Sequence, residues 1–269
     1  MRSTLAFCSL ALLPATISAQ MWGRDDYSAP RSGSADAKGA NLIEVRARAG
    51  TLEINGVEGL TQVRVKGIAR ASDEDDLDEI KLTVERRGTR VLIIADIPQH
   101  DGKWSNNTNR ALDLIIEVPR GAALDVEDSS GELEIRNVGA LDLDDSSGDI
   151  ELDNIAGALR IEDSSGEIRV NNVRGDIRVD DSSGNINIRD VTGRVVIDDD
   201  SSGDIDIIDV SGSVEVENDS SGDIDVRRVG GHFTVAHDGA GSIRHSGVKG
   251  EVRVPESRQS RRDRRGSRG

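Results

Sequence analysis

Aspartates that open a repeated tetrapeptide are the residues of this sequence with the clearest potential for chemistry. Asp-Ser-Ser-Gly occurs six times. If the repeats stack in register, the aspartates form a ladder in which neighbours repel by about 0.9 kcal/mol at ~4.8 Å in water. Divalent cations could offset this repulsion, because Ca²⁺ accepts carboxylate, hydroxyl and carbonyl oxygens. The candidate ligands are Asp128, Asp145, Asp163, Asp181, Asp200 and Asp219.

Turn amides and serine hydroxyls could offset the same repulsion without a metal. The chain lacks the glycine-rich nonapeptide that is typical of calcium β-rolls. We therefore expect no cofactor, and bound calcium is the alternative.

Two other sets of polar residues could form a site. His232, His237 and His245 could converge on a metal, but His245 falls in an apolar column, where a histidine that shields the end of the core is the simpler interpretation. Acidic residues after successive glycines could support carboxylate catalysis, yet they recur in every repeat, whereas an active site needs one special repeat. No G-x-S-x-G, H-E-x-x-H, GxGxxG or Walker pattern occurs, so we expect no enzyme. The acidic residues are Glu132, Asp149, Glu167, Asp204 and Asp223.

A tandem repeat must position these side chains. The closing glycines of the tetrapeptides lie 17 to 19 residues apart, and a second glycine halves each repeat. Within each half apolar and polar residues alternate, which is typical of a strand with one buried face. One repeat is too small to bury its own core, so neighbours must stack. The sequence thus predicts an all-β fold, a single-stranded parallel β-solenoid (β-helix) with coils of about 18 residues. One buried column should contain Ile150, Ile168, Ile186, Ile205 and Ile224.

The chain divides into five segments. Residues 1–19 combine a basic start, an apolar run and small residues before Gln20, which is typical of a secretory signal peptide. Residues 20–40 are small, polar and aperiodic, which predicts a disordered linker. Residues 41–120 show a looser strand pattern and are predicted to form irregular N-terminal coils or a cap. Residues 121–256 are predicted to form the regular solenoid, and residues 257–269 a disordered, Arg-rich tail.

The predicted tail carries six arginines against one aspartate. Its charge could tether the protein to an anionic surface such as lipopolysaccharide, and a solvated tail without a partner is the alternative. The tether residues would be Arg258, Arg261, Arg262, Arg264, Arg265 and Arg268.

Three stretches of the chain resemble a known bacterial family. Val118-Pro119-Arg120-Gly121, residues 124–135 (LDVEDSSGELEI) and the tandem Ser-Ser-Gly-Asp-Ile units are similar to the "putative adhesin" family with β-strand repeats, domain of unknown function 4097. The resemblance spans residues 42–254. It implies a β-solenoid, often at the cell envelope, with adhesion as a role, and it supplies no catalytic or ligand residues.

Composition limits the function further. Fifty acidic residues against 34 basic ones give a net charge of -16, which argues against a nucleic-acid partner. No stretch after the signal peptide is long and apolar enough for a membrane span. We predict a non-enzymatic, exported β-solenoid, in the periplasm, at the cell surface or secreted, that acts as an adhesin-like or envelope-interaction module. Its partner would be an envelope component, either polysaccharide or protein. The alternatives are a divalent-cation-binding structural rod and a carbohydrate-active enzyme on one face of the solenoid.

Overall fold

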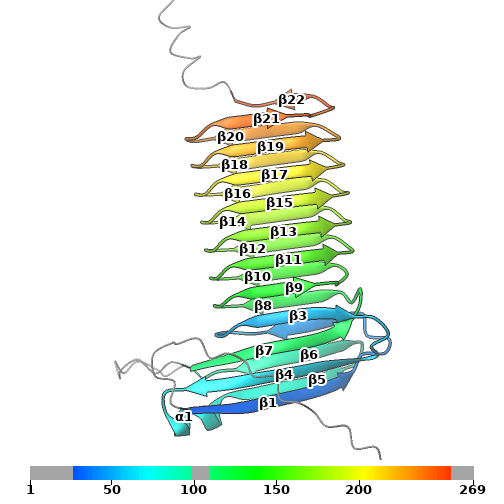
Figure 1. Ribbon diagram of the computed structural model, residues 1–269, viewed down its shortest axis with the longest axis vertical. Helices are drawn as coiled ribbons and strands as arrows, with labels where there is room; N and C mark the ends of the chain where they lie inside the picture. The colour runs from blue at the N-terminus through cyan, green and yellow to red at the C-terminus, as the bar shows by residue number, and fades with distance from the viewer. Residues whose placement is uncertain (1–26, 99–109, 256–269) are drawn as a thin grey trace, which may run out of the picture.

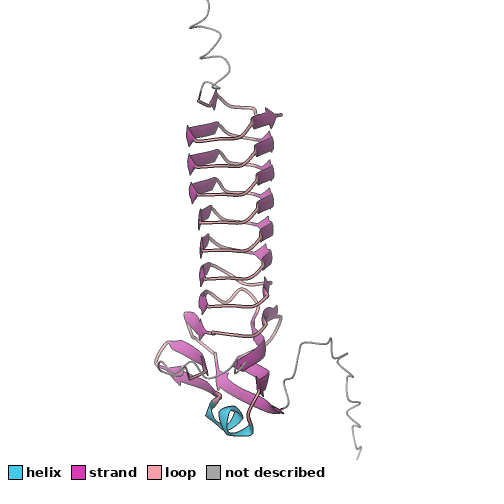
Figure 2. Cartoon of the chain, turned by 90° about the vertical axis from the view of Figure 1, so that its left-hand side faces the viewer, coloured by secondary structure: helices cyan, strands magenta, loops and turns pink. Residues whose placement is uncertain are grey.

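The computed structural model describes residues 27–98 and 110–255 and shows a rod of stacked strands with a broader N-terminal end (Figures 1 and 2). The predicted signal peptide, residues 1–19, and the predicted Arg-rich tail, residues 257–269, lie outside the described residues.

Each coil of the rod contributes one strand to each of two parallel sheets, which form the two long faces. The predicted single-stranded parallel β-solenoid is confirmed, with about 7 turns that repeat about every 19 residues. The regular strands of the first sheet are β9 (Leu133–Arg136), β11 (Ile150–Ile155), β13 (Ile168–Val173), β15 (Ile186–Val191), β17 (Ile205–Val210), β19 (Ile224–Val229) and β21 (Ile243–Ser246). Those of the second sheet are β8 (Leu124–Asp128), β10 (Leu141–Asp145), β12 (Leu159–Asp163), β14 (Ile177–Asp181), β16 (Val195–Asp200), β18 (Val214–Asp219), β20 (Phe233–Asp238) and β22 (Val252–Arg253).

The core consists of aliphatic columns that run along the rod. In the first sheet Ile150 pairs with Ile168, which pairs with Ile186, and the column continues through Ile205 and Ile224. These five side chains are at most 1% exposed. Alternation along each strand turns every second side chain inward, so stacking in register brings identical apolar residues together.

The N-terminal part begins with one coil of the same kind. Strands β2 (Leu42–Arg46) and β3 (Leu52–Val57) pair in parallel with β8 and β9, as a degenerate early coil should. The chain then reverses. Strand β4 (Gln62–Ala71) runs antiparallel to β7 (Arg110–Pro119), and β5 (Lys81–Arg87) runs antiparallel to β6 (Arg90–Asp96). A short helix, α1 (Glu74–Glu79), links the two pairs. The expected irregular segment is therefore one true coil plus an antiparallel cap.

The prediction of a disordered linker over residues 20–40 is wrong for part of that range, because Tyr27–Asp36 forms strand β1. This strand pairs antiparallel with β4 over ten residues and has no second neighbour in its sheet. An edge strand needs only its backbone and a few small inward side chains, here Ala29 and Ala35, so its sequence shows no apolar alternation. Pro30 is compatible with this position because an edge strand leaves some amides unpaired.

The cap closes the N-terminal end of both sheets. Strands β1 and β5 are the last strands of the two sheets, and they pack against each other. Gly33 of β1 lies so close to β5 that an added Cβ would be 2.6 Å from Cγ2 of Val84. Joining the two edges in this way protects unpaired strands from pairing with other chains.

Burial of the isoleucine column generates the first prediction. Ile186→Asp places an unpaired carboxylate in the core, and we expect it to lower the free energy of unfolding by more than about 3 kcal/mol in urea denaturation. The control is Arg189→Asp, which changes an exposed residue of the same strand, β15, and should cost within about 0.5 kcal/mol. Near-parental stability of Ile186→Asp would contradict the stacking described above.

Candidate functional site

The six tetrapeptide aspartates form one buried column along the second sheet. Each is the last residue of its strand, from β8 to β18, and each pairs with the aspartate of the next coil. Their exposed fractions are only 0–5%, so the column lies inside the rod and not on its surface. We call this set, Asp128, Asp145, Asp163, Asp181, Asp200 and Asp219, the aspartate column.

Turn amides satisfy part of the aspartate column. The amide of Ser183 donates to Oδ1 of Asp181 at 3.0 Å, and that of Ser202 donates to Oδ1 of Asp200 at 3.1 Å. The serine hydroxyls do not contribute in the expected way. The hydroxyl of Ser183 donates to the backbone carbonyl of Ser164 in the previous coil. Serine hydroxyls therefore join neighbouring turns, and the amides alone serve the carboxyl groups.

Each column residue has at least one carboxyl oxygen that lacks a hydrogen-bond partner and is closed off from solvent. This is Oδ2 at Asp163, Asp181 and Asp200, and both oxygens at Asp128, Asp145 and Asp219. Burial, together with repulsion from Asp181 and Asp219, raises the pKa of Asp200 from 3.8 to about 7. Burial also raises the pKa of Asp181 to about 6, although the amides of two serines act in the opposite direction. The alternation in the sequence already places Asp128, Asp145, Asp163 and Asp181 two residues after an inward apolar residue, a sign of burial that sequence reasoning missed.

The three C-terminal histidines are not brought together in a site. Nδ1 of His232 accepts a hydrogen bond from the amide of Glu251, and the His237 ring lies against the carbonyl of Glu217. The His245 ring packs over the buried Phe233 at a centroid distance of 6.0 Å, at the last coil of the core. Across residues 27–98 and 110–255 no three histidine, cysteine, aspartate or glutamate side chains are grouped to hold a metal ion.

Three of the five outer carboxylates that could have supported catalysis accept a backbone amide of the next coil. Oδ1 of Asp149 accepts from the amide of Glu167, and Oδ1 of Asp204 accepts from the amide of Asp223, one coil further on. Oδ1 of Asp223 likewise accepts a hydrogen bond from the amide of Ser242. These side chains therefore fasten successive coils at the corner of the rod.

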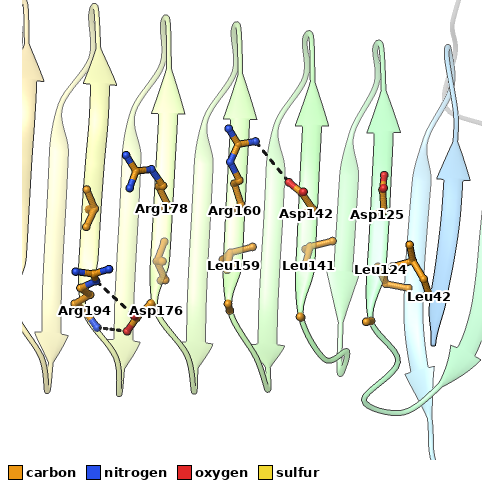
Figure 3. Close-up of a pocket in the computed structure, with 15 residues that line it drawn as sticks. Leu42, Leu124, Asp125, Leu141, Asp142, Leu159, Arg160, Asp176, Arg178 and Arg194 are labelled. Carbon is orange, nitrogen blue, oxygen red and sulfur yellow. Dashed lines mark hydrogen bonds and ion pairs between the residues drawn. The ribbon is translucent and has the colours of Figure 1, made fainter.

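An open groove crosses several coils of the second sheet and is the best candidate for a contact surface (Figure 3). It has a volume of about 530 Å³. Small residues, Ala123, Ala140 and Ala158, line it together with the leucines at the strand starts. We call it the alanine groove.

Charged side chains line the alanine groove beside these apolar residues. Arg160 reaches Asp142 of the previous coil at 3.7 Å and also pairs with Glu162 of its own strand. Arg194 and Asp176 form a second pair between coils, at 3.4 Å (Figure 3). Asp125 and Arg178 complete the charged residues of the lining. The groove thus offers cations, carboxylates and apolar surface in a line parallel to the rod.

Sequence reasoning missed the alanine groove, although a signal for it was present. Alanine directly follows the second glycine of the repeat at Ala140 and Ala158, where later coils carry Asp176 and Arg194. The resulting hollow depends on side chains from several coils, so it becomes visible only after the coils are stacked.

The fold and this surface define a β-solenoid with repeated charged faces. The family model of Toastrack DUF4097 matches residues 40–262, so the chain belongs to that family, and the resemblance predicted from the sequence is confirmed. No curated protein matches the chain. No helix among the described residues has the length and apolar character to cross a membrane.

Several solved structures are similar to this chain. A "putative adhesin" from Bacteroides fragilis is 15% identical, with 86% of this chain and 98% of that chain covered and a TM-score of 0.47. A "putative adhesin" from Parabacteroides merdae is 12% identical, with 87% and 98% covered and a TM-score of 0.40. A "putative lipid binding protein" from Parabacteroides distasonis is 14% identical, with 84% and 97% covered and a TM-score of 0.40.

The aspartate column generates a prediction about calcium. We expect the same melting temperature in EDTA, in Ca²⁺ and in Mg²⁺ at matched ionic strength, because the carboxyl groups are buried and turn amides already donate to three of the six. A bound cation would instead raise stability by about 2.7 kcal/mol at a hundredfold excess over its Kd. Asp181→Asn should be at least as stable as the parent, since it keeps the turn oxygen and removes a charge. A Ca²⁺-specific rise that disappears in this variant would contradict the prediction.

Proposed function

We propose that the protein is an exported, non-enzymatic, adhesin-like module that contacts a component of the cell envelope through the alanine groove. The observation that carries this proposal is the groove itself, in which an aliphatic residue at the start of each strand repeats coil after coil. A ligand that is extended along the rod can repeat the apolar contact at successive rungs, whereas a compact ligand can use only a few of these rungs. An extended envelope polysaccharide fits this requirement.

The mixture of groups in the groove also suits such a ligand. Leu141 and Leu159 begin their strands beneath the groove, and Arg160, Arg178 and Arg194 present guanidinium groups beside the apolar lining. Guanidinium groups bind carboxylates and phosphates through paired hydrogen bonds. These guanidinium groups pair with Asp142, Asp198 and Asp176, so we infer that an acidic group of the polysaccharide takes the place of one of these carboxylates.

A matched pair of arginines tests the groove. Arg160 and Arg169 lie on opposite sheets, and each bridges a glutamate two residues away in the sequence to an aspartate of the previous coil, at 3.7 Å from the latter. Both substitutions, Arg160→Glu and Arg169→Glu, should cost about 0.2–1 kcal/mol of stability, as expected for exposed ion pairs. We expect only Arg160→Glu to weaken binding to polysaccharide extracted from bacterial envelopes, by roughly tenfold in pull-down titrations. Equal binding by both variants and the parent would contradict the proposal.

The predicted Arg-rich tail generates a separate prediction. Deletion of residues 257–269 should leave the melting temperature almost unchanged and weaken salt-sensitive binding to lipopolysaccharide or heparin. The measurement is binding at low and at high salt, with Arg160→Glu as the comparison. If binding at low salt is equal with and without residues 257–269, the tail is not a tether.

A further inference from the structure

The aspartate column places like charges next to one another inside the protein. Neighbouring members occupy equivalent positions on consecutive rungs, about 4.8 Å apart, as at Asp181 and Asp200. The other charged groups that act on the column are also carboxyl groups: Asp144 beside Asp145, Asp180 beside Asp181, Asp199 beside Asp200, and Asp204 and Asp238 beside Asp219. Mutual repulsion therefore adds to the cost of burying each charge.

Hydrogen bonding offsets only part of this cost. One oxygen of Asp163, of Asp181 and of Asp200 accepts a serine amide, and the other has no partner. At Asp145 and Asp219 serine amides approach the carboxyl group, but neither oxygen reaches normal hydrogen-bond geometry. An ionised, buried oxygen without a donor is expensive, so the column needs a further ligand.

A proton is the ligand that fits these positions. A protonated carboxyl group gains an O–H donor, and the unpartnered oxygen on the next rung is an acceptor without a donor. One proton can therefore remove one charge and supply one missing hydrogen bond. We propose that the aspartate column is a proton-binding site, in which carboxyl groups on neighbouring rungs share protons while the rod is folded.

The titration behaviour of the column agrees with its geometry. Burial raises the pKa of Asp128 and of Asp200 to about 7, and that of Asp145, Asp163, Asp181 and Asp219 to about 6. Because these values lie above the ordinary 3.8, the folded chain binds more protons than the unfolded chain between about pH 4 and pH 7. Stability from the column is thus fully present below pH 4 and is lost as the pH rises through 6 and 7.

Surface carboxylates give folding stability the opposite dependence on pH, and they do so at lower pH values. Hydrogen bonds from arginine hold the pKa of Asp209 and of Glu251 below their usual values, so their contribution is lost as the pH falls below about 4. Together the two sets of groups predict greatest stability in mildly acidic surroundings, between about pH 4 and pH 6.

Urea unfolding of the full chain at several pH values tests the proposal. We expect the free energy of unfolding to decrease steadily from pH 5 to pH 8, with a slope near pH 6 that corresponds to about four protons taken up on folding. The double variant Asp145→Asn and Asp181→Asn should flatten this dependence and keep the turn oxygens. Asp142→Asn, which changes an exposed residue of the same strand as Asp145, should leave it unchanged.

Carbon NMR of the aspartate carboxyl groups provides a measurement that does not depend on the variants. We expect six carboxyl resonances to titrate near pH 6–7, apart from those of the exposed aspartates. A constant or rising stability from pH 5 to pH 8, or titration of all aspartates near pH 4, would overturn the proposal. A Ca²⁺-specific stabilisation at pH 8 would also overturn it, because the column would then hold a cation in place of protons.

Discussion

Stacking in register is the constraint on which the rest of the structure depends. Each backbone corner lies directly on the corner of the coil before it, and the approach is so close that a Cβ on Gly184 would lie 1.6 Å from the carbonyl oxygen of Gly166. The φ angle of Gly184 is 143°, which other residues rarely adopt. Glycine at this corner therefore allows coils to stack, and stacking allows a small repeat to share a core.

The same constraint makes each side chain a neighbour of its own equivalent. This is favourable for isoleucine, because identical aliphatic groups pack well along the rod. It is unfavourable for charges, and the outer faces relieve the repulsion at the places where the sign varies between coils, as where Arg160 meets Asp142 and Arg169 meets Asp149. The aspartate column cannot vary in this way, because each member closes the same turn. Protons shared between rungs remove the repulsion without changing the turn.

At each end of the rod, the last coil has no further coil to stack on, so other residues must cover it. At the N-terminal end the chain reverses direction, and β1 and β5 pack against each other, so no further parallel coil can be added there. At the other end His245 lies over Phe233, the last large apolar side chain of the core. The repeat thus determines the rod, and non-repeating residues determine where it stops.

The sequence by itself determined the rod, since glycine spacing and alternation specify strands, corners and the column from Ile150 to Ile224 without any long-range information. It also identified the aspartates and the family. Only the tertiary structure decided that β1 is a strand, because its extended conformation depends on pairing with β4 and not on an apolar pattern of its own. Alternation also turns most of the aspartates inward, but only the tertiary structure decided how completely they are enclosed and what shape the alanine groove has. Both depend on how tightly neighbouring coils enclose a side chain, and a periodic pattern indicates the direction of a side chain but not that enclosure.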